Sequence, residues 1–193
     1  MSRRTNERFA LDGSPWLSRV SQFGRPSGIK SIQTGSITIA DLTSSNTATI
    51  TSVDLNNSII IHGGRNTGST NTFVNQECRV ALTNATTVTV SRSGSSAVNV
   101  VGYTVIEFYP GVIRSVQRGT ITINSTNTSA TATITAVDTT KSVVFWLGSD
   151  ASSNGSLTAA YLTLTNSTTV TSTRNTQDGS STSVTGYQVV QFY

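Results

Sequence analysis

The sequence predicts an all-β protein, in which two tandem homologous antiparallel β-sandwich domains of about six strands each follow an extended N-terminal arm. Three observations support this prediction. Thr, Ile and Val recur in short runs between turn residues, and β-branched side chains favour strands. The second part of the chain repeats the first. No helical periodicity is evident after residue 28.

The composition excludes some classes of protein. Charged residues make up 11% of the 193 residues and hydrophobic residues 35%, both below the usual share, and Ser, Thr, Asn and Gly replace them. The low charge argues against charge-driven disorder. No stretch reaches the roughly 18 apolar residues of a membrane helix, and the first residues lack the apolar run of a signal peptide. We therefore expect no membrane span and synthesis in a cytoplasm, with which the single cysteine, Cys78, is consistent.

Residues 1–28 form the predicted arm, and most of the net charge lies there. The arm has five arginines and two acidic residues, a net charge of +3, whereas the remaining 165 residues carry a net charge of +1. The arginines are interleaved with large apolar side chains that a solvated tail would not need, so we expect the arm to dock into a partner. The absence of a dense basic run argues against nucleic-acid binding. The residues predicted to dock are Arg3, Arg4, Arg8, Phe9, Leu11, Trp16, Leu17, Arg19, Phe23 and Arg25.

The internal repeat sets the predicted domain boundaries. At an offset of 84 residues the chain aligns with itself without a gap from residue 29 onward, the offset falls to 82 for 82–92, and it returns to 84 for the closing strand. Such changes fall in loops, where insertions are tolerated. We predict one domain at 29–109 and a second at 113–193, joined by a linker at 110–112 that contains Pro110 and Gly111.

Each repeat has a similar predicted order of strands. In the first repeat the strands are expected near 30–40, 46–53, 58–63, 78–84, 86–92 and 100–109. Asp54 and Asp138 each follow a Thr-rich strand, and a short carboxylate at such a place accepts a hydrogen bond from the backbone two residues on. Both are therefore predicted to be turn residues.

The closing strand of each repeat is apolar on both faces. Because successive residues point to opposite sides, and a small sandwich has one inner face, we expect the second face to meet a neighbouring domain or subunit. The alternative, that aromatic rims cover exposed strand ends, stays open. The residues predicted for this contact are Tyr103, Val105, Tyr109, Tyr187, Val189 and Tyr193.

The sequence offers little catalytic chemistry. The one histidine, His62, is replaced by Trp146 in the second repeat, and one histidine with one cysteine cannot complete a metal site. A Ser-His-Asp triad would require His62, and no phosphate-binding glycine motif occurs. We expect a protein that is not an enzyme, with no cofactor and no metal.

Long polar loops differ completely between the repeats. The loop at 63–77 has no counterpart in the loop at 148–160, and 93–101 likewise differs from 175–185. Polar loops on a rigid sandwich can bind sugars through hydroxyl and amide groups, or they can be solvated connections. Both interpretations stay open at this point.

The repeated motifs resemble repeats in structural proteins of tailed bacteriophages. "TATITSVD" at 47–54 matches "TATITAVD" at 131–138, and "GYTVIEFY" at 102–109 matches "GYQVVQFY" at 186–193. The turn and the closing strand are also similar to the H-type lectin sandwich, and this resemblance implies a six-stranded, trimeric fold. No set of residues here matches the sugar-binding residues of that family, so sugar binding is not carried over.

We therefore expect a non-enzymatic structural protein of a tailed-phage virion, made in the host cytoplasm. It would be a head decoration or cement protein, or a collar or tail-surface component, and would dock by its N-terminal arm. The expected partners are other virion proteins and further copies of the chain, with a trimer favoured. The alternative is a receptor-binding tail fibre or lectin-like adhesin whose loops bind cell-surface glycan. The lack of a shaft between the arm and the domains favours the first interpretation.

Overall fold

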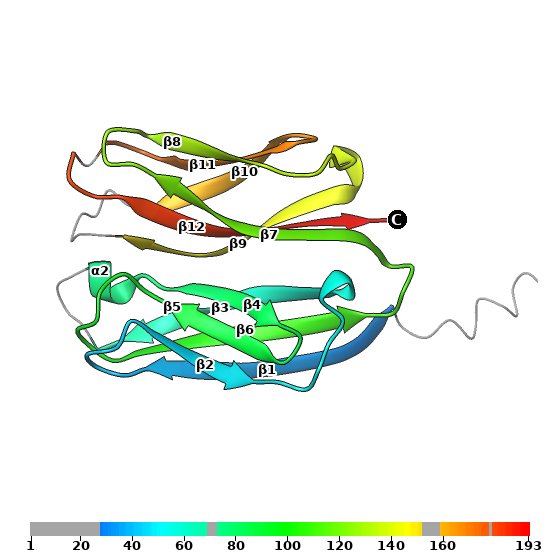
Figure 1. Ribbon diagram of the computed structural model, residues 1–193, viewed down its shortest axis with the longest axis horizontal. Helices are drawn as coiled ribbons and strands as arrows, with labels where there is room; N and C mark the ends of the chain where they lie inside the picture. The colour runs from blue at the N-terminus through cyan, green and yellow to red at the C-terminus, as the bar shows by residue number, and fades with distance from the viewer. Residues whose placement is uncertain (1–27, 69–72, 152–158, 178) are drawn as a thin grey trace, which may run out of the picture.

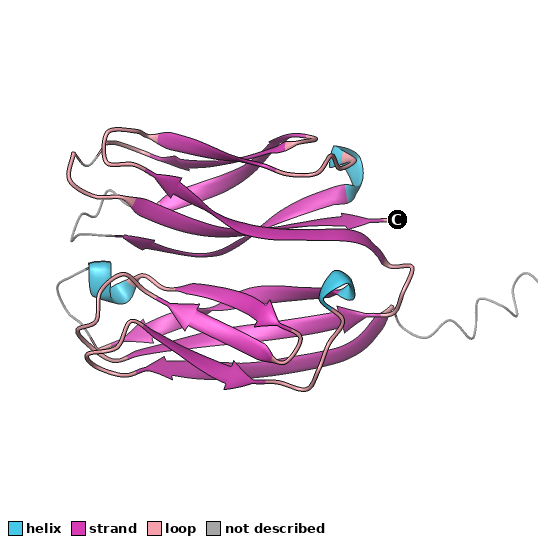
Figure 2. Ribbon diagram, in the orientation of Figure 1, coloured by secondary structure: helices cyan, strands magenta, loops and turns pink. Residues whose placement is uncertain are grey.

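The computed structural model describes residues 28–193 apart from 69–72, 152–158 and 178, and these residues form an all-β structure with antiparallel sheets (Figures 1 and 2). The N-terminal half contains β1 (Ile29–Ile39), β2 (Ser45–Thr49), β3 (Ser58–Thr67), β4 (Arg79–Asn84), β5 (Thr87–Ser91) and β6 (Asn99–Phe108). The C-terminal half contains β7 (Ile113–Ile123), β8 (Ser129–Thr133), β9 (Ser142–Ala151), β10 (Ala160–Asn166), β11 (Thr169–Arg174) and β12 (Ser183–Phe192). The short helical turns between strands are η1 (Leu55–Asn57), α2 (Phe73–Gln76) and η2 (Thr139–Lys141).

Each half is built like a small sandwich. In the N-terminal half, sheet β1–β6–β3 packs against β2–β5–β4, and in the C-terminal half β7–β12–β9 packs against β8–β11–β10 (Figure 1). A single pairing, Arg79 with Gly148, joins β4 to β9 and makes one six-stranded sheet of β2–β5–β4–β9–β12–β7. The two halves therefore meet along a shared strand edge as well as through side chains.

The strands lie where the alternating pattern predicts them, and the two halves share their register. Ile32 of β1 pairs with Ile106 of β6, and the residues 84 positions later, Val116 and Val190, pair in the same way in β7 and β12. Burial alternates along β5, β6 and β11, and in β5 only every second residue is buried, whereas β12 is buried on both faces.

The two predicted aspartate turns are confirmed. The backbone N–H of Asn56 donates to the Asp54 carboxylate over 2.9 Å, and the N–H of Thr140 donates to Asp138 over the same distance. These hydrogen bonds lower the pKa of both carboxyl groups, Asp54 chiefly through the side chain of Asn57 and Asp138 chiefly through the side chain of Thr140. Each aspartate caps the helical turn that leads into the next strand.

The closing strands β6 and β12 bury a different face from the one expected. Tyr103 and Val105 are buried in the core of the N-terminal half, and Tyr187 and Val189 are buried in the core of the C-terminal half. Tyr103 lies across Gly35 of the neighbouring strand, where an added Cβ would come within 2.7 Å of the tyrosine hydroxyl. This face is therefore the inner face of each half, so the four residues lie in the cores rather than on an outer surface.

The two halves meet instead through the opposite face of β12. Val190 of β12 and Ile113 of β7 pack with Ile59 of β3, and all three are buried. Leu147 of β9 reaches further and belongs to the same buried cluster as the core of the N-terminal half. The outer face of one half thus covers the edge of the other, between β3 and β4.

Candidate interaction surfaces

A polar clamp fixes the contact between the halves. The side chain of Gln188 accepts from the Ile60 N–H over 3.1 Å and donates to the Ile60 carbonyl over 3.4 Å, so its amide takes the place of a neighbouring strand at the β3 edge. Arg118 donates to Gln188 over 2.9 Å, to the Leu55 carbonyl over 3.2 Å, and to the Ser58 carbonyl. Burial lowers the pKa of Arg118 to about 10, and the guanidinium stays charged at neutral pH.

A second polar contact closes the other end of this interface. Arg79 of β4 donates to the carboxylate of Asp150 in β9 over 2.6 Å, and the Asp150 side chain is almost fully buried. Gly148 lies beside this pair with a φ of +97°, against the backbone of Cys78 and Arg79. A side chain at position 148 would have no room, so this glycine is needed both for its φ and for the close approach of two strands.

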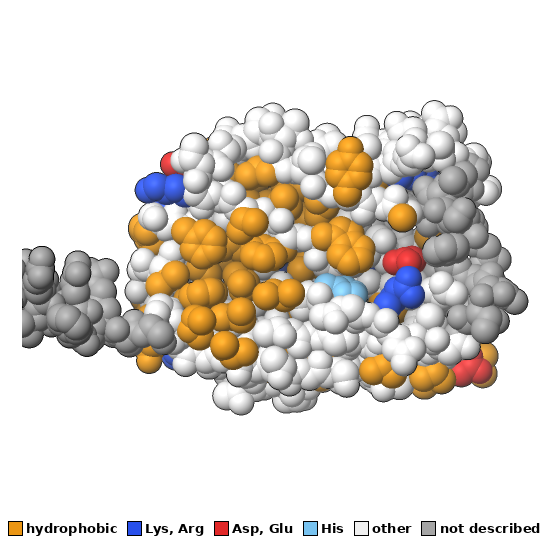
Figure 3. Space-filling view, turned by 180° about the vertical axis from the view of Figure 1, so that it is seen from behind, with side chains coloured by type: hydrophobic (Ala, Val, Ile, Leu, Met, Phe, Trp, Pro, Cys, Tyr) orange, Lys and Arg blue, Asp and Glu red, His pale blue; other side chains and the backbone are white. Residues whose placement is uncertain are grey.

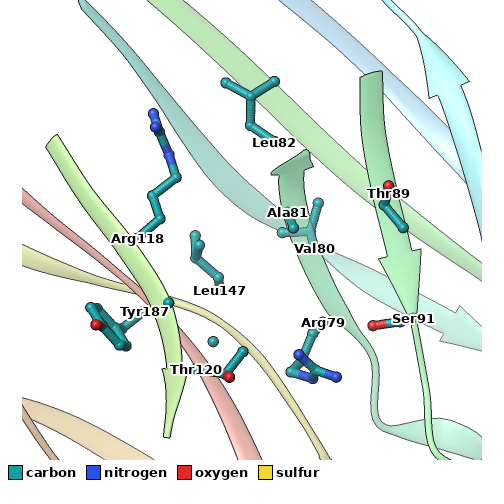
Figure 4. Close-up of a pocket in the computed structure, with 12 residues that line it drawn as sticks. Arg79, Val80, Ala81, Leu82, Thr89, Ser91, Arg118, Thr120, Leu147 and Tyr187 are labelled. Carbon is teal, nitrogen blue, oxygen red and sulfur yellow. The ribbon is translucent and has the colours of Figure 1, made fainter. Parts of the chain in front are cut away.

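A cavity of about 200 Å³ lies between the halves beside Leu147 (Figure 4). Its walls come from β4 and β5 of one half and from β7, β9 and β12 of the other. Arg79 and Arg118 contribute to the lining, and most of the remaining surface is apolar. The described lining has no carboxylate or imidazole, so it offers neither a general base nor a metal ligand.

Hydrophobic side chains on the outer face of sheet β1–β6–β3 and along β9 are exposed or only partly buried. We call these residues the apolar surface: Ile32, Ile61, Ile106, Phe108, Val143 and Trp146. Figure 3 shows a broad area of hydrophobic side chains on this side of the molecule, next to the single histidine. Contiguous exposed apolar areas of this kind mark interaction sites on soluble proteins.

An open hollow of about 420 Å³ adjoins the apolar surface around Trp146. The described residues that line it are His62, Gly64, Arg65, Glu77, Trp146, Ser149, Ala159 and Ala160. The imidazole and indole rings are 5.4 Å apart between centroids, and Arg65 forms an ion pair with Glu77. We call this the Trp146 hollow. It combines an aromatic ring with hydrogen-bonding groups of both polarities.

His62 is placed as a packing residue within this hollow. Its ring is partly buried against Trp146, and burial lowers the pKa of the imidazole, so the neutral form is favoured in the folded protein. The Gly64 N–H donates to Nδ1 over 3.0 Å. No group of three or more His, Cys, Asp or Glu side chains among the described residues is arranged to hold a metal ion.

Two other titratable groups lie inside the N-terminal half. Glu107 is buried, which would raise its pKa, but hydrogen bonds from Lys30, from the Asp54 N–H and from Ser31 outweigh burial and lower the pKa. The thiol of Cys78 is buried, and burial raises its pKa. A buried thiol with a raised pKa is a poor nucleophile.

The remaining predicted residues are placed as follows. Tyr109 and Tyr193 are exposed at the ends of the closing strands, so they stay candidates for an external contact. The docking residues of the predicted arm, from Arg3 to Arg25, lie outside the described residues. Within the described part of the chain, no helix has the length and apolar character needed to cross a membrane.

Sequence reasoning missed Arg118, Gln188 and Leu147, which make the contact between the halves. A signal existed, because the repeat aligns these residues with Thr34, Thr104 and Gly63, in strands that otherwise match closely.

The comparisons with known proteins add no family assignment. No protein-family model, no curated protein and no solved structure matches the chain.

Proposed function

We propose that this chain is a non-enzymatic structural protein of a tailed-phage virion, a head decoration or cement protein or a collar or tail-surface component. It is made in the host cytoplasm and docks on the capsid or tail by its N-terminal arm. The proposal includes an origin of the two halves by duplication, and a homo-oligomer with a trimer favoured. The observation that carries it is the apolar surface, which leaves hydrophobic side chains of both halves open to a partner.

The mechanism of such a protein is cementing. Apolar area buried between the protein and the shell, worth about 25 cal/mol per Å², stabilises the assembled particle over its separate parts. The arm supplies arginines and large apolar residues, the types that dominate binding energy at protein interfaces. The two halves, joined by the Gln188 and Arg118 hydrogen bonds and the Arg79–Asp150 ion pair, then form the body that the arm attaches.

The test is binding to virions that lack the protein. Full-length chain and chain without residues 1–28 are incubated with such particles, and bound protein is measured after sedimentation. We expect binding of the full-length chain and its loss on deletion of the arm. Unchanged binding after the deletion would show that the arm does not dock.

A second candidate function is glycan binding, as in a receptor-binding fibre or adhesin, and the Trp146 hollow favours it. An exposed indole can pack against the apolar face of a sugar ring, while Arg65 and Glu77 can hydrogen-bond to hydroxyl groups. The test is a glycan array with the wild-type chain and Trp146→Ala. Signal that Trp146→Ala removes supports this function, and no signal above background argues against it.

A further inference from the structure

Part of the edge between β9 and β10 in the C-terminal half is less well covered than the matching edge between β3 and β4 in the N-terminal half. The sequence repeat aligns three inner positions at these edges: Ile60 with Val144, Val80 with Leu162, and Leu82 with Leu164. The first member of each pair is buried, and the second is only partly buried. The difference arises because Leu147 and Phe145 of the C-terminal half cover the edge between β3 and β4, while no described residue covers the edge between β9 and β10 in this way.

The outer face of the N-terminal half shows the complementary difference. Val190 and Ile113 on the outer face of sheet β7–β12–β9 are buried against the N-terminal edge. The residue aligned with Val190 is Ile106, which is only partly buried, and Ile32, in the same sheet, is 56% exposed. Both positions stay hydrophobic although the described chain covers Ile106 only in part and leaves Ile32 exposed.

The internal contact buries Ile59 on the outer face of sheet β1–β6–β3 and residues 147–151 of β9. It leaves the rest of that face, with Ile32 and Ile106, and the rest of the β9–β10 edge, with Val144 and Leu164, exposed or only partly buried. We propose that a second copy of this chain covers both: the β9–β10 edge of one copy packs on the outer face of sheet β1–β6–β3 of the next. The contact between copies repeats the contact between the halves. The proposal deepens the oligomer named above, and it rests on that part of the proposed function.

Shape supports a second copy over an unrelated partner. On the N-terminal face Gly63 stands where the C-terminal face has the protruding Leu147. On the C-terminal edge the larger Tyr161 stands where the N-terminal edge has Arg79, while Trp146, at the position of His62, already lies against His62 of the same chain. A smaller residue on the N-terminal face is thus matched by a larger residue on the C-terminal edge. Each copy also has one such face and one such edge, so the two are present in equal numbers.

The contact joins two different surfaces and is heterologous, so repetition gives a ring if the rotation closes. Three copies would then place six similar halves around one axis, in agreement with the trimer proposed above. The proposed contact is built from residues outside the arm, so it can be tested separately from docking on the virion.

The test uses two charge substitutions at exposed positions that folding tolerates. Ile32→Lys alters the face, and Tyr161→Lys alters the edge, where Tyr161 is 60% exposed. Thr47→Lys, at an exposed position on β2 in the other sheet, is the matched control. Mass is measured by light scattering and sedimentation velocity between about 1 and 100 µM, and unfolding midpoints confirm that each variant is folded.

We expect an oligomer for the wild type and for Thr47→Lys, and a monomer for Ile32→Lys and for Tyr161→Lys. An equimolar mixture of the two monomeric variants should form a dimer and nothing larger, because only one intact face and one intact edge can meet. The oligomer should persist without residues 1–28.

Three outcomes would overturn the proposal: a wild type that stays monomeric throughout, an oligomer that survives both substitutions, or an oligomer that disappears with residues 1–28. Arm docking is judged by particle binding and the contact between copies by mass, so the failure of one is distinguishable from the failure of the other.

Discussion

Gly148 and Gly64 occupy aligned positions in the two halves and allow a controlled test of the contact between β4 and β9. Both have a positive φ, +97° and +90°. A Cβ added at Gly148 would collide with the Cys78 carbonyl oxygen and lie 2.8 Å from the Cα of Arg79, whereas a Cβ at Gly64 would meet nothing within 4 Å. The substitutions Gly148→Ala and Gly64→Ala therefore share the backbone strain and differ in the collision.

The expected losses follow from these two contributions. A non-glycine residue in the left-handed region costs about 1–2 kcal/mol, and this cost applies to both variants. At Gly148 the two strands must also separate, and overpacking of this kind costs a further 1–3 kcal/mol or so. We expect Gly64→Ala to lose about 1–2 kcal/mol of unfolding free energy and Gly148→Ala about 2–5 kcal/mol.

The measurement is urea unfolding of both variants, with hydrogen exchange of the β3, β4 and β9 peptides at low urea. Gly148→Ala should accelerate exchange in β4, in the other half of the chain, because separation of β9 from β4 removes the pairing of Arg79 with residue 148. Gly64→Ala should leave β4 protected. Equal free-energy losses in the two variants, or exchange changes confined to β9, would refute the view that β4 and β9 form a close contact.

Three further substitutions test the rest of the interface and the buried acid. Leu147→Ala should lower the free energy of unfolding by about 2–4 kcal/mol, because the side chain belongs to the core of the other half. It should also raise hydrogen exchange in β4. A loss of unfolding free energy below about 1 kcal/mol would contradict this. Arg118→Met should lower the free energy of unfolding by about 1–3 kcal/mol. The control Arg114→Met, at an exposed position of the same strand, should change it by no more than about 0.5 kcal/mol. Glu107→Gln should be less stable than the wild type at pH 7, and the difference should shrink as the pH falls through the lowered pKa of Glu107, below the ordinary 4.5, because protonation there removes the wild-type advantage. Urea midpoints at pH 7 and pH 3 check the last expectation, and a difference that does not change with pH would exclude it.

The strands and turns could be predicted from the sequence because their causes are local. Alternating Val and Thr indicate strands such as β5 without knowledge of any partner. Asp54 and Asp138 bond to backbone groups two residues away, so the turns depend only on nearby residues.

The contact between the halves could not be predicted in the same way, because the closing strands are apolar on both faces. Period-two alternation separates two faces but does not say which one is inside when both are hydrophobic. The inner face is decided by Tyr103 and Tyr187, which need Gly35 and Gly119 on the neighbouring strands to lie flat across them. That requirement is visible only when the pairing register is known.

The aligned residues of the two halves also indicate how strong a contact between copies would be. In the contact between the halves, Arg118 and Gln188 hold the β3 edge by hydrogen bonds. The residues aligned with them on the free face are Thr34 and Thr104, which are too short to form such a clamp. A contact between copies on that face would be almost wholly apolar, and so weaker than the internal one. We therefore expect the two halves to join within one chain first, and the copies to associate afterwards as their concentration rises.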